Sequence, residues 1–140
     1  MDLIEARNNY ISDKYNFLDA SSKVCQDVIL SKIAKSPLSK HVTIKGGVVI
    51  HNISNDSRRA TRDIDLDFIR YSLADEAIQK FVNTLNNVDD GISINIVAPI
   101  EELSQQEYNG KRVIAELMDG AKNKIGIKLD IGVHKNIKIE

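Results

Sequence analysis

The two segments that decide the fold of this chain are Ile44-Lys45-Gly46-Gly47 and Thr61-Arg62-Asp63-Ile64-Asp65-Leu66-Asp67-Phe68. Glycines at the end of a strand allow backbone N–H groups to approach a phosphate closely. In the second segment acidic and apolar residues alternate, so an extended strand would place its carboxylates on one face. Carboxylates arranged in this way hold Mg²⁺ against a phosphate. Together the two segments indicate a metal-assisted phosphoryl-transfer site.

Composition is typical of one intracellular domain. The chain has 140 residues, enough to bury a core, and its 19 basic and 20 acidic residues nearly balance. This balance excludes a general electrostatic attraction to nucleic acid but leaves room for a local basic patch. Cys25 is the single cysteine, so no intramolecular disulfide forms, and we expect it in the core of a helix. We predict one cytoplasmic domain over residues 1–140.

No part of the sequence predicts contact with a membrane. A membrane-spanning helix requires roughly 20 consecutive apolar residues, and no run approaches that length. The N-terminus, Met1-Asp2-Leu3-Ile4-Glu5, has early acids and lacks the cationic region of a secretory signal. We therefore expect a soluble protein with no membrane partner.

Apolar periodicity divides the chain into helices and strands. One helix is expected to end before Pro37, with a core face of Leu18, Cys25, Val28, Ile29 and Ile33. A capping box over residues 72–75 predicts a second helix, whose apolar stripe is Ile78, Phe81, Val82 and Leu85. Strands are expected at residues 41–45, 63–68, 92–96, 111–118 and 124–133, with a helix or turn starting at 48–50 and a polar connection over 99–106. This order predicts an α/β or α+β fold with a mixed β-sheet flanked by helices.

Three aspartates are the candidate metal ligands and catalytic residues. Residues i and i+2 of a strand lie about 7 Å apart and point the same way, so Asp63 and Asp65 can share one cation or hold two. Asp130 is the lone acid of an apolar, glycine-rich strand and is the best third carboxylate, suited to orient or deprotonate an attacking hydroxyl. Asp67 shares the face but lies further along, and we expect a solvated or structural role for it.

Simpler explanations exist for several of these features. An Asp-x-Asp strand is often only a solvated face, and Gly46-Gly47 after a strand is more often a turn. Lys45 can reach a phosphate or lie at the surface, and Arg62 can pair with the neighbouring acids or with a substrate phosphate; the sequence leaves both open. The histidines have no metal-like spacing, so we expect surface or packing roles for His41, His51 and His134.

Four different short motifs follow one another along the chain. They are Ile44-Lys45-Gly46-Gly47, Arg59-x-Thr61-x-Asp63-Ile64-Asp65-Leu66, Tyr108-x-Gly110-x-Arg112-Val113 and Ile127-x-Leu129-Asp130-Ile131-Gly132. With them the chain resembles the nucleotidyl transferase toxins of the AbiEii/AbiGii type, which are related to the MenT toxins. The spaced set, from Val42 to Gly132, is much more specific than any single motif.

The resemblance implies a polymerase-β-like nucleotidyltransferase fold and a set of site residues. Gly46 and Gly47 would lie against the nucleotide phosphates, with Lys45 and Arg62 as neighbouring candidates for nucleotide binding. The resemblance further implies Mg²⁺ or Mn²⁺ on Asp63 and Asp65, with Asp130 completing the triad of carboxylates. Members act as toxins of toxin–antitoxin or abortive-infection systems, and some transfer a nucleotide from an NTP to tRNA. The implied partners are therefore an NTP, tRNA or another acceptor, and a cognate antitoxin.

The chain departs from the family pattern in two places. Val48 and Val49 follow the glycine pair, where relatives often carry a small hydroxyl residue or Ala, so only backbone contacts to a phosphate are expected there. Relatives are also usually longer, with a helical C-terminal region. Residues 1–140 would then be a minimal member, half of a split protein or the N-terminal part of a longer one.

Three functions fit the sequence. The first is a metal-dependent nucleotidyltransferase that moves NMP from an NTP to an acceptor hydroxyl, with tRNA as the preferred acceptor. The second is a non-catalytic module of the same fold that binds a nucleotide or an antitoxin. The third uses the same metal site but modifies a protein or an antibiotic.

Overall fold

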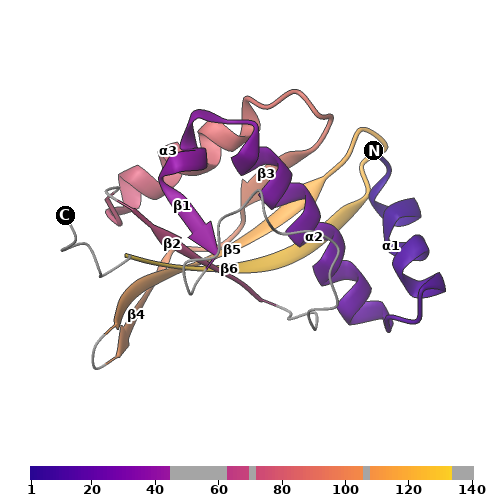
Figure 1. Ribbon diagram of the computed structural model, residues 1–140, viewed down its shortest axis with the longest axis horizontal. Helices are drawn as coiled ribbons and strands as arrows, with labels where there is room; N and C mark the ends of the chain where they lie inside the picture. The colour runs from indigo at the N-terminus through magenta and orange to yellow at the C-terminus, as the bar shows by residue number, and fades with distance from the viewer. Residues whose placement is uncertain (45–62, 70–71, 106–107, 134–140) are drawn as a thin grey trace.

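The computed structural model describes residues 1–44, 63–69, 72–105 and 108–133 (Figure 1). Its helices are α1 (Leu3–Ser12), α2 (Phe17–Ala34), a short 3₁₀ turn η1 (Pro37–Lys40) and α3 (Asp75–Asn86). Its strands are β1 (Val42–Ile44), β2 (Asp63–Phe68), β3 (Ser93–Ile96), β4 (Glu101–Gln105), β5 (Tyr108–Met118) and β6 (Lys124–Val133). The predicted mixed sheet flanked by helices is confirmed.

The sheet is built around β6, the central strand of the order β1-β2-β6-β5-β3. β6 runs parallel to β2 and antiparallel to β5, whereas β1 pairs antiparallel with β2. β3 and β4 both pair with β5, β4 along its first half and β3 along its second. The parallel pair joins segments far apart in the sequence, and the two segments that carry the predicted carboxylates are the ones it joins.

Alternation along β6 from Lys124 to Ile131 explains why its predicted bounds, residues 124–133, are correct, although Val133, which has the spacing of the core face, is 40% exposed. Ile125, Ile127, Leu129 and Ile131 are at most 5% exposed, and they face the core. The residues between them face the opposite side of the sheet. Because only one face of the strand is apolar, helices are needed on that face only. Helices α2 and α3 cover it.

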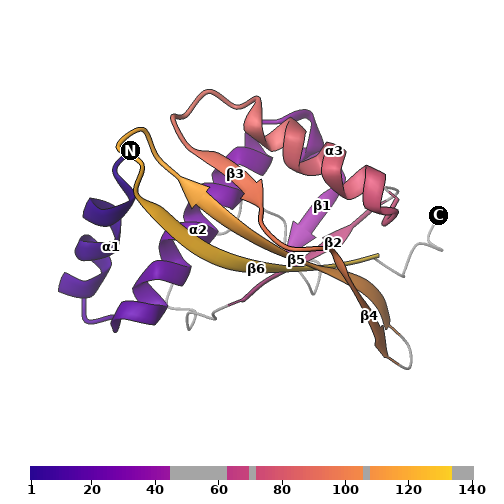
Figure 2. The same cartoon turned by 180° about the vertical axis from the view of Figure 1, so that it is seen from behind.

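Helices α2 and α3 cover the same face of the sheet. Figure 1 shows α2 in front of β5 and β6, and Figure 2, from behind, shows both strands in front of α2 with no described helix across their middle. The open face is therefore the one that carries the alternate residues of β2, β5 and β6, including Asp65 and Asp130.

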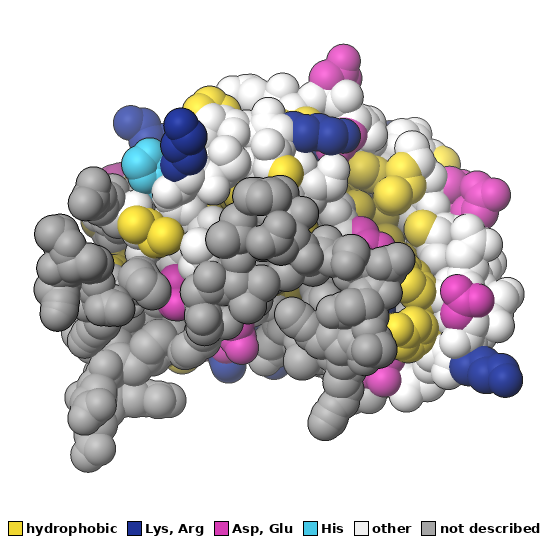
Figure 3. Space-filling model, viewed as in Figure 1, with side chains coloured by type: hydrophobic (Ala, Val, Ile, Leu, Met, Phe, Trp, Pro, Cys, Tyr) yellow, Lys and Arg dark blue, Asp and Glu magenta, His cyan; other side chains and the backbone are white. Residues whose placement is uncertain are grey.

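The first predicted helix is confirmed, with one error at its start. The side chain of Asn16 caps α2 by accepting a hydrogen bond from the Asp19 amide, and Cys25 lies fully buried on the core face as expected. Leu18 is 54% exposed, so its assignment to the core was wrong. It lies in the first turn of α2, where Figure 3 shows hydrophobic side chains at the surface between α1 and α2. The neighbouring Phe17 ring lies 4.2 Å from the guanidinium of Arg7.

The second predicted helix has the expected apolar stripe but a different beginning. Ile78, Phe81, Val82 and Leu85 are all buried in α3. The predicted capping box is wrong, because the N-cap is Ala74, which has no side-chain cap. Ser72 Oγ instead accepts a hydrogen bond from the Ala74 amide in the turn before the helix.

Strand β4 lies within the segment expected to be a polar connection, residues 99–106. Glu101 to Gln105 pair with the first residues of β5, which begins at Tyr108, three residues before its predicted start at Lys111. The sequence of β4 shows no alternation of apolar and polar residues, so its partner strand decides its conformation. The strand expected at residues 92–96 begins one residue later, at Ser93, because Ile92 belongs to the preceding turn.

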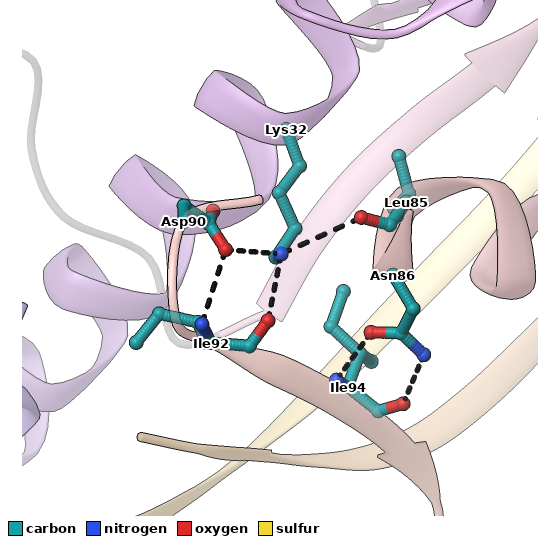
Figure 4. A network of polar contacts seen from close by, with 6 residues as sticks. All are labelled: Lys32, Leu85, Asn86, Asp90, Ile92 and Ile94. Atoms are coloured by element: carbon teal, nitrogen blue, oxygen red, sulfur yellow. Dashed lines mark hydrogen bonds and ion pairs between the residues drawn. The ribbon is translucent and has the colours of Figure 1, made fainter. Parts of the chain in front are cut away.

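A buried lysine ties α2 to the chain between α3 and β3. Lys32 is fully buried, and its Nζ donates hydrogen bonds to Asp90 Oδ1 (2.7 Å), the Ile92 carbonyl (2.8 Å) and the Leu85 carbonyl (3.4 Å) (Figure 4). Beside it, the amide of Asn86 donates to the Ile94 carbonyl and accepts from the Ile94 N–H, as a neighbouring strand would. The three acceptors satisfy the buried ammonium, which is otherwise costly in a protein interior.

We predict that Lys32→Met lowers the free energy of unfolding by about 3 kcal/mol, because it leaves Asp90 without its cation and two carbonyls without a donor. Urea denaturation of the two proteins measures the difference. Lys35→Met is the matched control, since this lysine is exposed at the end of the same helix. Equal losses in both variants would contradict the assigned role of Lys32.

Asp119 anchors the N-terminus to the turn between β5 and β6. Its carboxylate accepts hydrogen bonds from the backbone amides of Leu3 (2.8 Å), Ala121 (3.0 Å) and Asn123 (2.9 Å), and from the Asn123 side chain (2.9 Å). These donors, with the Leu3 amide first, lower the pKa of Asp119 to about 2. The ionised carboxylate is therefore part of the folded structure.

The lowered pKa of Asp119 predicts a pH-dependent stability. An unfolded aspartate has a pKa of about 3.9, so the stabilisation by Asp119 is complete above that pH and is lost as the pH falls through about 2. Asp119→Asn should lower the melting temperature at pH 7, and the gap to wild type should close between about pH 4 and pH 2. Thermal melts across this range test it, with Asp89→Asn as an exposed control. A gap independent of pH would contradict the assignment.

Candidate active site

Parallel pairing of β2 with β6 places Asp65 directly beside Asp130. The two residues are Cα partners in the register, and neighbouring strands lie about 4.8 Å apart. Cross-strand partners project from the same face, so both carboxylates lie on the open face of the sheet. Asp65 is exposed, and the side chain of Asp130 is 15% exposed. The predicted approach of two distant segments is thus present in the fold.

The other two acids of β2 occupy the flanking register positions. Asp63 pairs with Lys128, and the structure describes its backbone only. Asp67 pairs with Thr43 on one side and Gly132 on the other, and it is only 8% exposed. A solvated role for Asp67 is therefore wrong, because its side chain is largely removed from solvent; a structural role remains our expectation, and it is not without a partner.

The predicted phosphate-binding residues lie outside the described residues. These are Lys45, Gly46, Gly47 and Arg62. The helix or turn expected at residues 48–50 and the surface or packing roles expected for His51 and His134 also lie outside the described residues. The strand before the glycine pair is confirmed over Val42–Ile44, and Ile44 pairs with Leu66, the residue after Asp65. Described β1 therefore ends beside β2, the strand that carries Asp65.

Arg112 is the site residue that our sequence interpretation missed. It is the Cα partner of Asp130 on β5, and its guanidinium forms a bidentate ion pair with the Asp130 carboxylate. Nε donates to Oδ1 at 2.7 Å and Nη2 donates to Oδ2 at 2.9 Å. The signal for this residue was its place in the third motif, but the motif alone gives it no partner. Asp65, Asp130 and Arg112 therefore form one row across β2, β6 and β5.

A groove lies beside this row on the open face. It has a volume of about 370 Å³, and its lining includes Val97, Ile114, Gly126 and Lys128. Ile114 and Lys128 are register partners, each two residues along its strand from Arg112 or Asp130. The charged row therefore borders a partly apolar surface.

The donor chemistry of Asp65 and Asp130 suits a hard divalent cation. Mg²⁺ and Mn²⁺ prefer carboxylate oxygens, and Mg²⁺ usually takes one or two carboxylates together with substrate phosphates. Within the described ranges no group of three or more His, Cys, Asp and Glu side chains could hold a metal ion. Two adjacent carboxylates on an open face fit a site that is completed by a nucleotide.

Two other reactive side chains of the described residues, Cys25 and His41, have surroundings that indicate structural roles. Cys25 is fully buried, and burial raises the pKa of its thiol to about 12, so no thiolate nucleophile forms near neutral pH. His41 is bound through Nδ1 to the carbonyl of Ile69, at 3.1 Å, which agrees with the packing role expected for it.

Comparison with known protein families identifies the family of the chain. A family described as "Nucleotidyl transferase AbiEii toxin, Type IV TA system" matches residues 28–139. The chain belongs to the AbiEii family. The matched range contains all six described strands and therefore both carboxylate segments, whereas α1 and the first part of α2 precede it.

AbiEii membership confirms the resemblance and gives the chain its class. It is a nucleotidyl transferase toxin of a type IV toxin–antitoxin system, which implies an antitoxin partner. A search of curated proteins found no match. Among the described helices, none combines the length and the apolar character needed to cross a membrane.

Proposed function

We propose that this AbiEii member transfers NMP from an NTP to an acceptor hydroxyl in a metal-dependent reaction, with tRNA as the acceptor. The observation that carries the proposal is the register between Asp65 and Asp130, which brings two carboxylates from distant segments together. A solvated acidic strand alone would not require a second acid beside it. Family membership supports the transferase class.

The proposed roles combine the pairing of β2 with β6 with what the resemblance to the family implies for the remaining residues. Asp63 and Asp65 would hold Mg²⁺ or Mn²⁺, with Asp130 as the third carboxylate, and Lys45, Gly46, Gly47 and Arg62 would hold the triphosphate. When bound, the cation would neutralise the charge on the phosphates. In the transfer, the acceptor oxygen forms a bond to the α-phosphorus as the bond to pyrophosphate breaks. Asp130 orients the hydroxyl and accepts its proton.

The test is incubation of the chain with each α-³²P-labelled NTP, total tRNA and Mg²⁺. We expect label in RNA from wild type, and a loss of about 100-fold or more in Asp65→Asn and Asp130→Asn. Asp89→Asn, an exposed acid in the turn after α3, is the matched control and should retain full transfer. Circular dichroism of each variant checks that it is folded.

Three outcomes would contradict parts of this proposal. Unchanged transfer by Asp65→Asn or Asp130→Asn rejects the carboxylate site. Label in the protein fraction instead of RNA rejects tRNA and favours a protein acceptor. Binding of an NTP by wild type without any transfer favours the non-catalytic module.

A further inference from the structure

The ion pair between Arg112 and Asp130 uses both oxygens of a carboxylate that the proposed function assigns to catalysis. A guanidinium that meets a carboxylate edge-on through two hydrogen bonds is the strongest and most directional form of such a pair. The Arg112 side chain is 29% exposed and that of Asp130 is 15% exposed, so solvent screens the pair only in part. This contact is therefore more than a mobile surface ion pair.

The pair also balances charge in the row. Like charges directly opposite each other on neighbouring strands are destabilising, and Asp65 and Asp130 are such a pair. Arg112, on the other side of Asp130, supplies the compensating positive charge. A divalent cation between the two aspartates would supply the same compensation. The guanidinium and a bound cation would therefore each compensate the charge of the same carboxylate, whose two oxygens Arg112 already uses.

We propose that Arg112 is a positioning residue that holds Asp130 in the cation-free protein and competes with the divalent cation for it. The inference rests on the metal site of the proposed function. Free Mg²⁺ or Mn²⁺ then binds weakly, because the positive charge of Arg112 opposes it. A nucleotide triphosphate brings negative charge that gives Arg112 a second anionic partner, so cation and nucleotide bind cooperatively.

The proposal is tested by Mn²⁺ binding to the full chain, measured by electron paramagnetic resonance of the free ion. Arg112→Gln removes the charge but keeps a hydrogen-bond donor, and it should tighten Mn²⁺ binding by about 10-fold. Arg112→Lys keeps the charge without the fork and should bind Mn²⁺ as wild type does. Lys124→Gln makes the same charge change at the exposed start of β6, about 20 Å away along the strand, and should have no effect.

Unchanged or weaker Mn²⁺ binding in Arg112→Gln overturns the proposal, as does equal tightening in Arg112→Lys or Lys124→Gln. Failure of the underlying site is read separately from Asp65→Asn and Asp130→Asn. If these two variants bind Mn²⁺ as wild type does, the metal site itself is wrong. If they lose Mn²⁺ binding while Arg112→Gln is unchanged, only the role of Arg112 is wrong.

A second measurement follows the Arg112 side chain by nuclear magnetic resonance of the wild-type protein. The only variant it needs is Arg112→Lys, whose spectrum lacks the Arg112 Nε–H signal and so assigns it. The Nε–H of Arg112 in wild type should give a separate ¹H–¹⁵N resonance because it is held in the ion pair. Titration with Mg²⁺ and an NTP should shift this resonance as the cation reaches Asp130. A resonance unchanged at saturating Mg²⁺ and NTP would refute the competition.

Discussion

The parallel pairing of β2 with β6 is the constraint on which the site depends. It fixes the register in which Asp65 and Asp130 are Cα partners, and a slip of one residue would turn one carboxylate toward the core. The register is held by burial, because Ile64 and Leu66 on β2 and Leu129 and Ile131 on β6 are nearly inaccessible to solvent. The helices contribute indirectly: α2 and α3 cover that core face and leave the other open. The same strand pair therefore packs the core with one face and places the two acids on the other.

Charge is the second organising factor. Asp65 and Asp130 lie side by side and repel each other. The guanidinium of Arg112, on the third strand of the row, compensates this repulsion. The buried ammonium of Lys32 has a different environment, because three oxygen acceptors surround it. No proposed ligand site among the described residues includes these acceptors. One cation therefore has a purely structural environment, whereas the other lies at the edge of the proposed chemistry.

The parts predicted well from sequence are those in which a periodic pattern is strong. The alternation of β6 gave its bounds to the residue, and the apolar stripe of α3 gave its buried face. The pattern failed where tertiary partners decide: β4 has no alternation and forms because β5 lies beside it. Leu18 has the spacing of the core face but lies in the first turn of α2, where it remains exposed.

The same limit applies to the site. The sequence predicts that Asp65 and Asp130 converge, since each lies on the polar face of its strand, but no local pattern encodes the register between strands so far apart. The partner of Arg112 could not be predicted for the same reason, although a motif contains the residue. The glycine pair lies outside the described residues, so the phosphate-binding role of this segment stays a prediction.

The position of β6 in the sheet has a consequence for how the protein is made. It is the last of the described strands in the chain, yet it lies between β2 and β5 in space. A nascent polypeptide that has not yet gained this strand cannot bring its acidic segments together, and β2 and β5 lack their shared neighbour. Translation therefore delays the meeting of Asp65 and Asp130 until β6 has been added, and termination before Lys124 would leave Asp65 without this neighbour.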